Sequence, residues 1–218
     1  MMENYTNSEA GVWYHEQLEH PESFPFSFTY NGIRYDGFSA AAFRETGRFM
    51  SSDEKKETNE RVWIMQDGLQ VTLRTAYYPV YGASEWTVWF ENTGCENSGI
   101  IENPESSLTF TGKHPVLKGI LGDHVNLYQP YAYDLEELPV HFMSDSGRPT
   151  HVNFPYFNLE YGEVGVMLAI GWAGTWTADF TSDGETTTFT ARSTAGLRTF
   201  LKPGEKIRTA LFVRAPYN

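Results

Sequence analysis

Few residues of this sequence stand at the spacings that catalysis or metal binding requires. His15 and His20 flank Glu16 in a run that resembles the zinc-protease motif, but the two histidines are five positions apart. The motif needs histidines four positions apart, because that spacing puts both on one face of a helix. We therefore interpret residues 1–23 as a solvated N-terminal extension without a metal site.

Motifs for nucleophilic or phosphate chemistry are also absent. Neither Gly-x-Ser-x-Gly nor a Walker loop occurs in the sequence. Cys95 follows a turn and has no histidine near it in the sequence, which predicts a passive thiol. The 28 acidic residues will bring some carboxylates together by chance, so the sequence alone selects no glycosidase pair. We assign no catalytic residue, no metal ligand and no cofactor.

Aromatic residues are the more informative class, at 16% of the chain. Exposed rings stack on the apolar faces of sugars, and loops on a rigid sandwich commonly carry binding groups. Trp172 and Trp176 flank a short Ala-Gly-Thr segment, and Tyr128 lies in a proline-containing loop. His151, beside a turn, has the chemistry to bind a sugar hydroxyl. The alternatives are core packing for each ring and a structural hydrogen bond for His151.

Charge and composition exclude several classes of partner. The 218 residues include 16 Lys and Arg against 28 Asp and Glu, a net charge of −12, which argues against nucleic-acid binding. No apolar run reaches the ~18–20 residues that span a bilayer, so no membrane partner is expected. The single cysteine excludes an intramolecular disulfide. No signal peptide is visible, which leaves open a cytoplasmic protein or a secreted one with its signal removed. The oligomeric state is not assigned.

Alternation with period two is the main structural signal and predicts strands. It is clearest in Leu69–Tyr77, in Trp86–Phe90 and in Ile207–Val213, where β-branched and aromatic residues recur. Asn31-Gly32 and similar Asp-Gly pairs separate such runs and predict tight hairpins. Residues 24–218 are therefore predicted to form one all-β domain, a large antiparallel β-sandwich.

Three segments carry weaker signals. The charged run Asp53–Arg61 is interpreted as a solvated loop or short helix. The proline-rich segment Asn103–Asn153 is predicted to form short strands joined by long loops. The apolar run Val164–Ile170 is predicted to be a strand buried on both faces.

Three blocks of sequence resemble a known family. They are Glu85–Gly94, Phe154–Trp176 with its Pro-Tyr-Phe-Asn-Leu-Glu and Ala-Ile-Gly-Trp-Ala-Gly-Thr-Trp segments, and Leu201–Leu211. In this order they resemble the N-terminal β-supersandwich domain of α-galactosidase-like, melibiase-group glycoside hydrolases. The resemblance covers residues 24–216.

The resemblance implies a galactose-mutarotase-like supersandwich that precedes a catalytic (β/α)₈ barrel in the same parent chain. It implies that the barrel begins just after Asn218 and carries the nucleophile and the acid/base, so this chain is not an enzyme on its own. Its function would be to brace the barrel and shape the sugar-binding entrance, through the Gly122–Asp134 and Arg148–Asn158 loops. The candidate sugar contacts are Tyr128, Arg148, His151, Asn158, Trp172 and Trp176.

Two further hypotheses stay open. A free-standing carbohydrate-binding module would use Trp172, Trp176 and the Tyr128–Tyr133 cluster as a stacking platform. A sandwich enzyme would need its own pair of facing carboxylates in a cleft.

Overall fold

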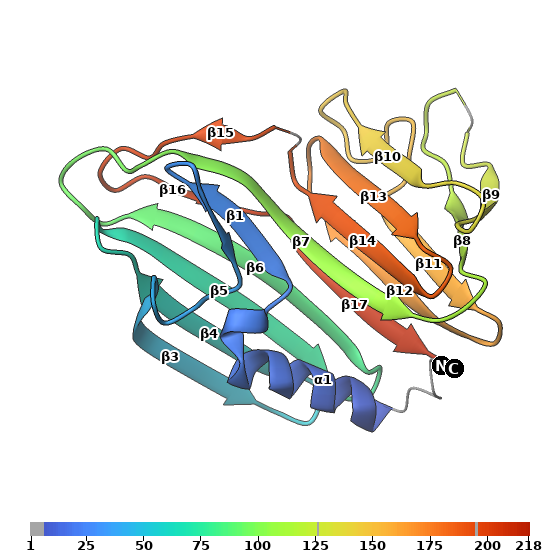
Figure 1. Cartoon of the computed structure of the whole chain (residues 1–218), viewed down its shortest axis with the longest axis horizontal. Helices are drawn as coiled ribbons and strands as arrows, with labels where there is room; N and C mark the ends of the chain where they lie inside the picture. Colours follow the sequence, from blue (N-terminus) through green and yellow to red (C-terminus); the bar gives the residue numbers. More distant parts are fainter. Residues whose placement is uncertain (1–6, 126, 195) are drawn as a thin grey trace.

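The described part of the chain folds into two antiparallel sheets packed face to face, with one α-helix against the larger sheet (Figure 1). The computed structural model describes residues 7–125, 127–194 and 196–218. The large antiparallel β-sandwich predicted from the alternation is confirmed.

The smaller sheet has seven strands. They are β1 (Phe26–Tyr30), β2 (Ile33–Asp36), β7 (Ile101–Thr111), β10 (Val140–Ser144), β13 (Trp176–Ser182), β14 (Thr186–Arg192) and β15 (Arg198–Thr199). Their order is β10-β13-β14-β7-β1-β2, and β15 pairs with β7.

The larger sheet has ten strands. They are β3 (Arg44–Ser52), β4 (Glu57–Ile64), β5 (Leu69–Tyr78), β6 (Ala83–Asn92), β8 (Val116–Ile120), β9 (Pro130–Asp134), β11 (Tyr156–Tyr161), β12 (Val164–Gly171), β16 (Lys206–Arg208) and β17 (Leu211–Tyr217). Their order is β3-β4-β5-β6-β17-β12-β11-β8-β9, and β16 pairs with β6.

Aromatic rings fill much of the space between the sheets. Phe28 of the smaller sheet lies 4.9 Å from Phe90 of the larger one, measured between ring centroids. Trp63 stacks on Phe38 at 4.5 Å, and both side chains are buried. Burying such large apolar surfaces is the main source of stability in a sandwich. Much of the aromatic content therefore serves the core.

The predicted hairpins are present. Asn31 and Gly32 both have positive φ angles, 51° and 79°, and Tyr30 pairs directly with Ile33. Such angles define a two-residue turn whose twist matches that of the flanking strands. Asp67-Gly68 joins β4 to β5, and Asp183-Gly184 joins β13 to β14.

The interpretation of Asp53–Arg61 as a loop or short helix was wrong. Residues 53–56 form a turn in which Asp53 accepts hydrogen bonds from the backbone of Lys55 and Lys56, and β4 starts at Glu57. Asn59 and Arg61 of β4 face the inner side of the sheet although they are polar, which hid the alternation.

The expectation of a solvated N-terminal segment was also wrong for residues 7–19, which form helix α1 (Asn7–Glu19). Ala10, Tyr14 and Leu18 follow one another on one face of the helix and are buried. Tyr14 stacks on Tyr77 of β5 at 5.3 Å. A short 3₁₀ turn, η1 (Pro21–Ser23), leads from α1 to β1. Residues 1–6 lie outside the described part, and the division of the chain at residue 24 stays a prediction.

His15 of α1 and His20, which lies between α1 and η1, do not form a site. His15 Nε2 lies 2.8 Å from Glu57 Oε2, whereas His20 pairs with Glu22 at 3.4 Å. The two histidines therefore have separate partners.

Two predicted strands differ in detail from the structure. The run Ile207–Val213 is divided into β16 and β17, because the backbone N–H of Val88 donates to the Thr209 side chain at 3.0 Å. Strand β12 is buried on its inner face, but Met167 on the other face is 43% exposed. Burial on both faces therefore holds for only part of β12.

The proline-rich segment was predicted partly correctly. β8, β9 and β10 are short strands joined by long loops, as expected. β7, however, is a long strand that passes through Asn103 and Pro104.

Candidate functional site

Two loops lie side by side at one end of the sandwich. They join β8 to β9 (residues 121–129) and β10 to β11 (residues 145–155), and we call them the rim loops. The backbone N–H of Gly122 donates to Val152 O at 2.7 Å, and that of Asp123 donates to Thr150 O at 2.8 Å. The structure therefore brings together the two loops on which the sequence places Tyr128, Arg148 and His151.

Side chains strengthen this contact. Asp123 accepts a hydrogen bond from Thr150 Oγ1 at 2.8 Å and pairs with Arg148 at 3.4 Å. A side chain on Gly122 would not fit, because its Cβ would lie 2.0 Å from Thr150 O. Arg148 thus has a structural partner within the rim.

His151 is held in the same way. Its ring stacks on His124 of the other rim loop, with 4.5 Å between ring centroids. Its Nδ1 lies 3.0 Å from Asp145 Oδ1, and its side chain is 17% exposed. The structural hydrogen bond considered for His151 is therefore present.

Three aromatic rings meet at the rim loops, and we call them the rim aromatic cluster: Tyr128, the half-buried Phe154, and Tyr156 at the start of β11. Phe154 stacks on Tyr156 at 5.3 Å and meets Tyr128 edge-on at 6.1 Å. Tyr128 is 49% exposed and Tyr156 is 54% exposed. Phe154 and Tyr156 were not predicted as site residues. Their spacing of two around Pro155 could have indicated a shared face next to the predicted loop.

The rest of the proposed tyrosine platform lies elsewhere. Tyr131 and Tyr133 of β9 stack on each other at 5.0 Å, and both rings pack near Phe142. Burial raises the pKa of Tyr131 above its ordinary value. Tyr131 packs at the edge of the core, Tyr133 stacks on it and is 36% exposed, and Tyr128 alone joins the rim aromatic cluster.

Trp176 is a correction to the predicted site. Its side chain is fully buried against Phe157, with 5.8 Å between ring centroids. Its Nε1 donates to the carbonyl oxygen of Pro149 at 2.7 Å. A ring without an exposed face cannot stack on a sugar. Trp176 instead holds the rim loop of residues 145–155 through its hydrogen bond to Pro149.

Trp172 and Asn158 lie outside the rim loops. The half-buried Trp172 has the Arg208 guanidinium 5.1 Å from its ring centroid. Asn158 of β11 donates to Glu160 Oε1 and accepts from the Tyr217 hydroxyl, each at 2.7 Å. The six predicted residues are therefore not one constellation.

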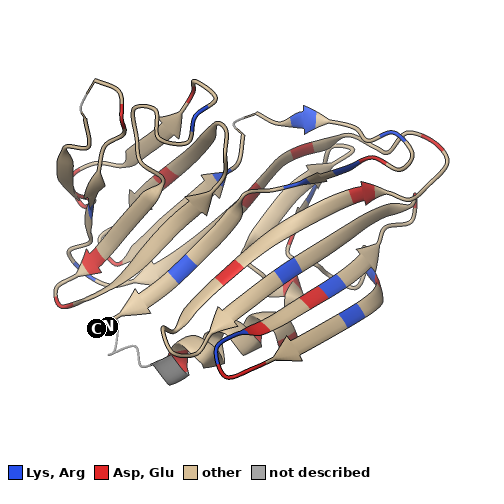
Figure 2. Cartoon of the chain, turned by 180° about the vertical axis from the view of Figure 1, so that it is seen from behind, with Lys and Arg blue, Asp and Glu red and all other residues tan. Residues whose placement is uncertain are grey.

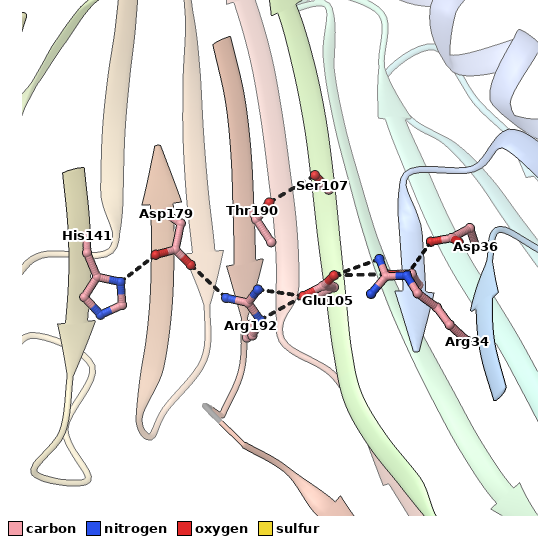
Figure 3. A network of polar contacts seen from close by, with 9 residues as sticks. Arg34, Asp36, Glu105, Ser107, His141, Asp179, Thr190 and Arg192 are labelled. Carbon is pink, nitrogen blue, oxygen red and sulfur yellow. Dashed lines mark hydrogen bonds and ion pairs between the residues drawn. The ribbon is translucent and has the colours of Figure 1, made fainter. Parts of the chain in front are cut away.

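A chain of charged side chains crosses the outer face of the smaller sheet (Figure 3). Glu105 of β7 lies at its centre and binds Arg34 of β2 at 3.0 Å and Arg192 of β14 at 2.7 Å. Arg192 also binds Asp179 of β13 at 2.8 Å, and Asp179 binds His141 of β10 at 2.6 Å. Glu105 accepts a hydrogen bond from Arg34, and this bond raises the pKa of the Arg34 guanidinium above its ordinary value.

This network contains the kind of carboxylates that a sandwich enzyme would need. Glu105 and Asp179 are, however, joined through the guanidinium of Arg192. A glycosidase pair instead flanks a space for the substrate. The network is therefore a structural connection between strands. Within the described ranges, no group of three or more histidine, cysteine or acidic residues could hold a metal ion.

Comparisons with known proteins identify the fold. No family model matches the chain, and no curated protein matches it. Among solved structures, the GH36 α-galactosidase AgaA from Geobacillus stearothermophilus matches with a TM-score of 0.66 and 15% identity, over 89% of this chain. The galactosidase domain of the α-galactosidase–sucrose kinase AgaSK matches at 0.65 and 15%, over 88%. The α-galactosidase from Lactobacillus brevis matches at 0.65 and 14%, over 89%.

These matches define the chain as a β-sandwich of the type found in GH36 α-galactosidases. The expected resemblance is confirmed at the level of the fold. The chain spans only 29–30% of the length of those three chains.

Proposed function

We propose that this chain is the non-catalytic N-terminal domain of an α-galactosidase-like glycoside hydrolase. The observation that carries the proposal is the asymmetry of the fold match, which covers 88–89% of this chain but 29–30% of each α-galactosidase. A catalytic (β/α)₈ barrel takes about 250 residues and cannot be contained in this sandwich. The catalytic barrel is the partner that this domain would brace.

The chemistry of the described residues supports a non-catalytic role. Glu105 and Asp179, the two carboxylates at the centre of the charged network, both pair with Arg192. The two rim loops are pinned to each other by backbone hydrogen bonds and by Asp123. Such a rigid edge suits a domain that positions groups for a neighbour.

The rim aromatic cluster is the part that would shape the sugar-binding entrance. Tyr128 and Tyr156 are both about half exposed and flank Phe154. Their apolar faces and hydroxyl groups match the two kinds of surface that a sugar presents. Carbohydrate is therefore the ligand expected at the rim once the barrel is in place.

The experiment that tests the non-catalytic assignment uses aryl α-galactosides and the purified chain. We expect no turnover above that of a mock purification. Turnover that copurifies with the chain through several chromatographic steps would overturn the assignment.

The second candidate is a free-standing carbohydrate-binding module, which the exposure of Tyr128 and Tyr156 favours. Titration of the isolated chain with galactose and raffinose separates the two functions. Millimolar binding that is lost in Tyr156→Ala, with the fold intact, supports a module. Absence of binding at the rim supports a domain that needs its barrel.

In the described ranges, no helix has both the length and the apolar character of a membrane span.

A further inference from the structure

The outer face of the larger sheet contains a groove of about 410 Å³ beside the edge strand β3. Phe49 of β3 forms one wall, and β4, β5 and β6 form the floor. Figure 2 shows this sheet from behind, with acidic and basic residues interspersed on neighbouring strands. Binding sites for small molecules commonly measure about 300–1,000 Å³, so the groove is large enough for a small ligand.

Phe49 offers an open aromatic surface in this groove. Its side chain is 63% exposed, although it is one of the larger apolar side chains of the sheet. The ring lies against Gly47, where an added Cβ would be 3.1 Å from the nearest ring carbon. The backbone at Gly47 therefore supports the ring and leaves much of it free to stack on a ligand.

Two ion pairs line the groove and cancel in charge. Arg74 Nε donates to Glu60 Oε2 at 2.5 Å, and Lys56 Nζ lies 3.5 Å from Glu85 Oε1. The Tyr78 hydroxyl donates to the same oxygen of Glu85 at 2.9 Å. A lining with two cations and two carboxylates gives no preference for a charged ligand.

Each ion pair leaves part of its hydrogen-bonding capacity unused. Among the described residues, Glu60 Oε1, Glu85 Oε2 and both terminal nitrogens of Arg74 have no hydrogen-bond partner. Free acceptors and free donors therefore lie near one another. A hydroxyl group both donates and accepts, so neighbouring hydroxyls on one ring would satisfy both kinds at once.

The geometry points to this groove as a binding site for an uncharged sugar ring, with its apolar face on Phe49 and its hydroxyls on Glu60, Arg74 and Glu85. An ion would be repelled by one half of each pair, and an apolar ligand would leave the free donors and acceptors desolvated without partners. The site is distinct from the rim loops, because β3 and β9 are the opposite edges of the larger sheet. It does not depend on the proposed catalytic partner.

The test is an NMR titration of the ¹⁵N-labelled chain with galactose, glucose and raffinose, up to about 50 mM to detect millimolar dissociation constants. We expect saturable shifts of amides in β3, β4, β5 and β6. Phe49→Ala should weaken this binding about tenfold, whereas Phe49→Tyr, which keeps the ring, should retain it. Tyr156→Ala, at the rim, is the control and should leave the groove shifts unchanged.

Two results would overturn the assignment. One is the absence of saturable shifts in the groove for all three sugars. The other is binding that persists in Phe49→Ala and disappears in Tyr156→Ala, which would place the sugar at the rim. Thermal unfolding of each variant confirms that the fold is retained, as expected for two exposed positions.

Discussion

The indole nitrogen of Trp176 donates a hydrogen bond to the carbonyl oxygen of Pro149 at 2.7 Å. Trp176 begins β13 in the core, whereas Pro149 lies in a rim loop. This bond therefore couples the packing of the sandwich to the position of the candidate site.

Trp176→Phe should loosen that coupling. The variant keeps an aromatic ring but removes the donor and leaves a small cavity, which should lower the free energy of unfolding by about 2 kcal/mol. Urea denaturation measures the loss, and hydrogen exchange should show reduced protection in residues 145–155. Trp172→Phe is the matched control. It should lower the free energy of unfolding by less, because Trp172 is only half-buried. Equal losses in the two variants would contradict the special role of Trp176.

Gly122→Ala should separate the rim loops. The new Cβ would lie 2.0 Å from Thr150 O and 2.7 Å from the backbone nitrogen of Asn153, so the backbone must move. We expect faster hydrogen exchange at the amides of Gly122 and Asp123, with the core strands unaffected. Unchanged protection of both amides would show that the loops tolerate the methyl group and are not held as described.

Glu105→Gln should destabilise the smaller sheet. The Glu105 side chain is 10% exposed and binds two arginines, so its loss leaves Arg34 with only the exposed Asp36 and Arg192 with only Asp179 as carboxylate partners. Charge-assisted hydrogen bonds of this kind contribute about 1.5–3 kcal/mol. Asp36, whose side chain is 72% exposed, also pairs with Arg34 at 2.9 Å. Asp36→Asn should therefore lower the free energy of unfolding by less than about 0.5 kcal/mol. Chemical denaturation of the two variants tests this order, and a reversed order would refute it.

Acid should loosen helix α1 through Glu45. Arg61 has a side chain that is only 6% exposed, binds Glu45 and donates to Leu18 O at the end of the helix. Burial of Glu45 raises its pKa, but the hydrogen bond and charge of Arg61 outweigh it and lower the pKa below the ordinary 4.5. Because the folded pKa is depressed, the stabilisation is present above pH 4.5 and is lost as the pH falls through the folded value.

Glu45→Gln provides the check on this pH dependence. Unfolding should be followed between pH 7 and pH 3, with hydrogen exchange of the α1 amides reporting on the helix, which packs on the sandwich through Trp13 and Trp86. The wild-type chain should lose stability below about pH 4.5 and the variant should lose less over the same range. Parallel curves for the two proteins would exclude Glu45 as the responsible group.

The strands and hairpins could be predicted from the sequence because their signals are local. Asn31-Gly32 requires no tertiary contact to favour its turn, and the alternation in Leu69–Tyr77 directly gives the buried face. Helix α1 was missed because its buried stripe of Ala10, Tyr14 and Leu18 is narrow and mixed in size. The sequence predicted Arg61 to be solvated. Its burial was missed because it depends on a distant partner, the carbonyl of Leu18.

The candidate site was harder to predict for a similar reason. The sequence gives Trp172 and Trp176 equal weight, but the segment that holds them leaves β12 of the larger sheet at Trp172 and enters β13 of the smaller sheet at Trp176. As a result Trp176 is buried and Trp172 packs beside Arg208. The contact between the rim loops depends on backbone hydrogen bonds between segments that are far apart in the sequence. The sequence does not indicate the 63% exposure of Phe49, because that exposure follows from the position of β3 at the edge of the larger sheet.

One measurement tests most directly whether this sandwich supports a catalytic barrel. The barrel encoded with this chain in its native gene would be expressed with and without residues 1–218, and hydrolysis of an aryl α-galactoside would be measured for both forms. We predict full activity with the sandwich and a large loss of activity and thermal stability without it. A native gene that encodes no barrel, or a barrel that is equally active and stable alone, would contradict the claim.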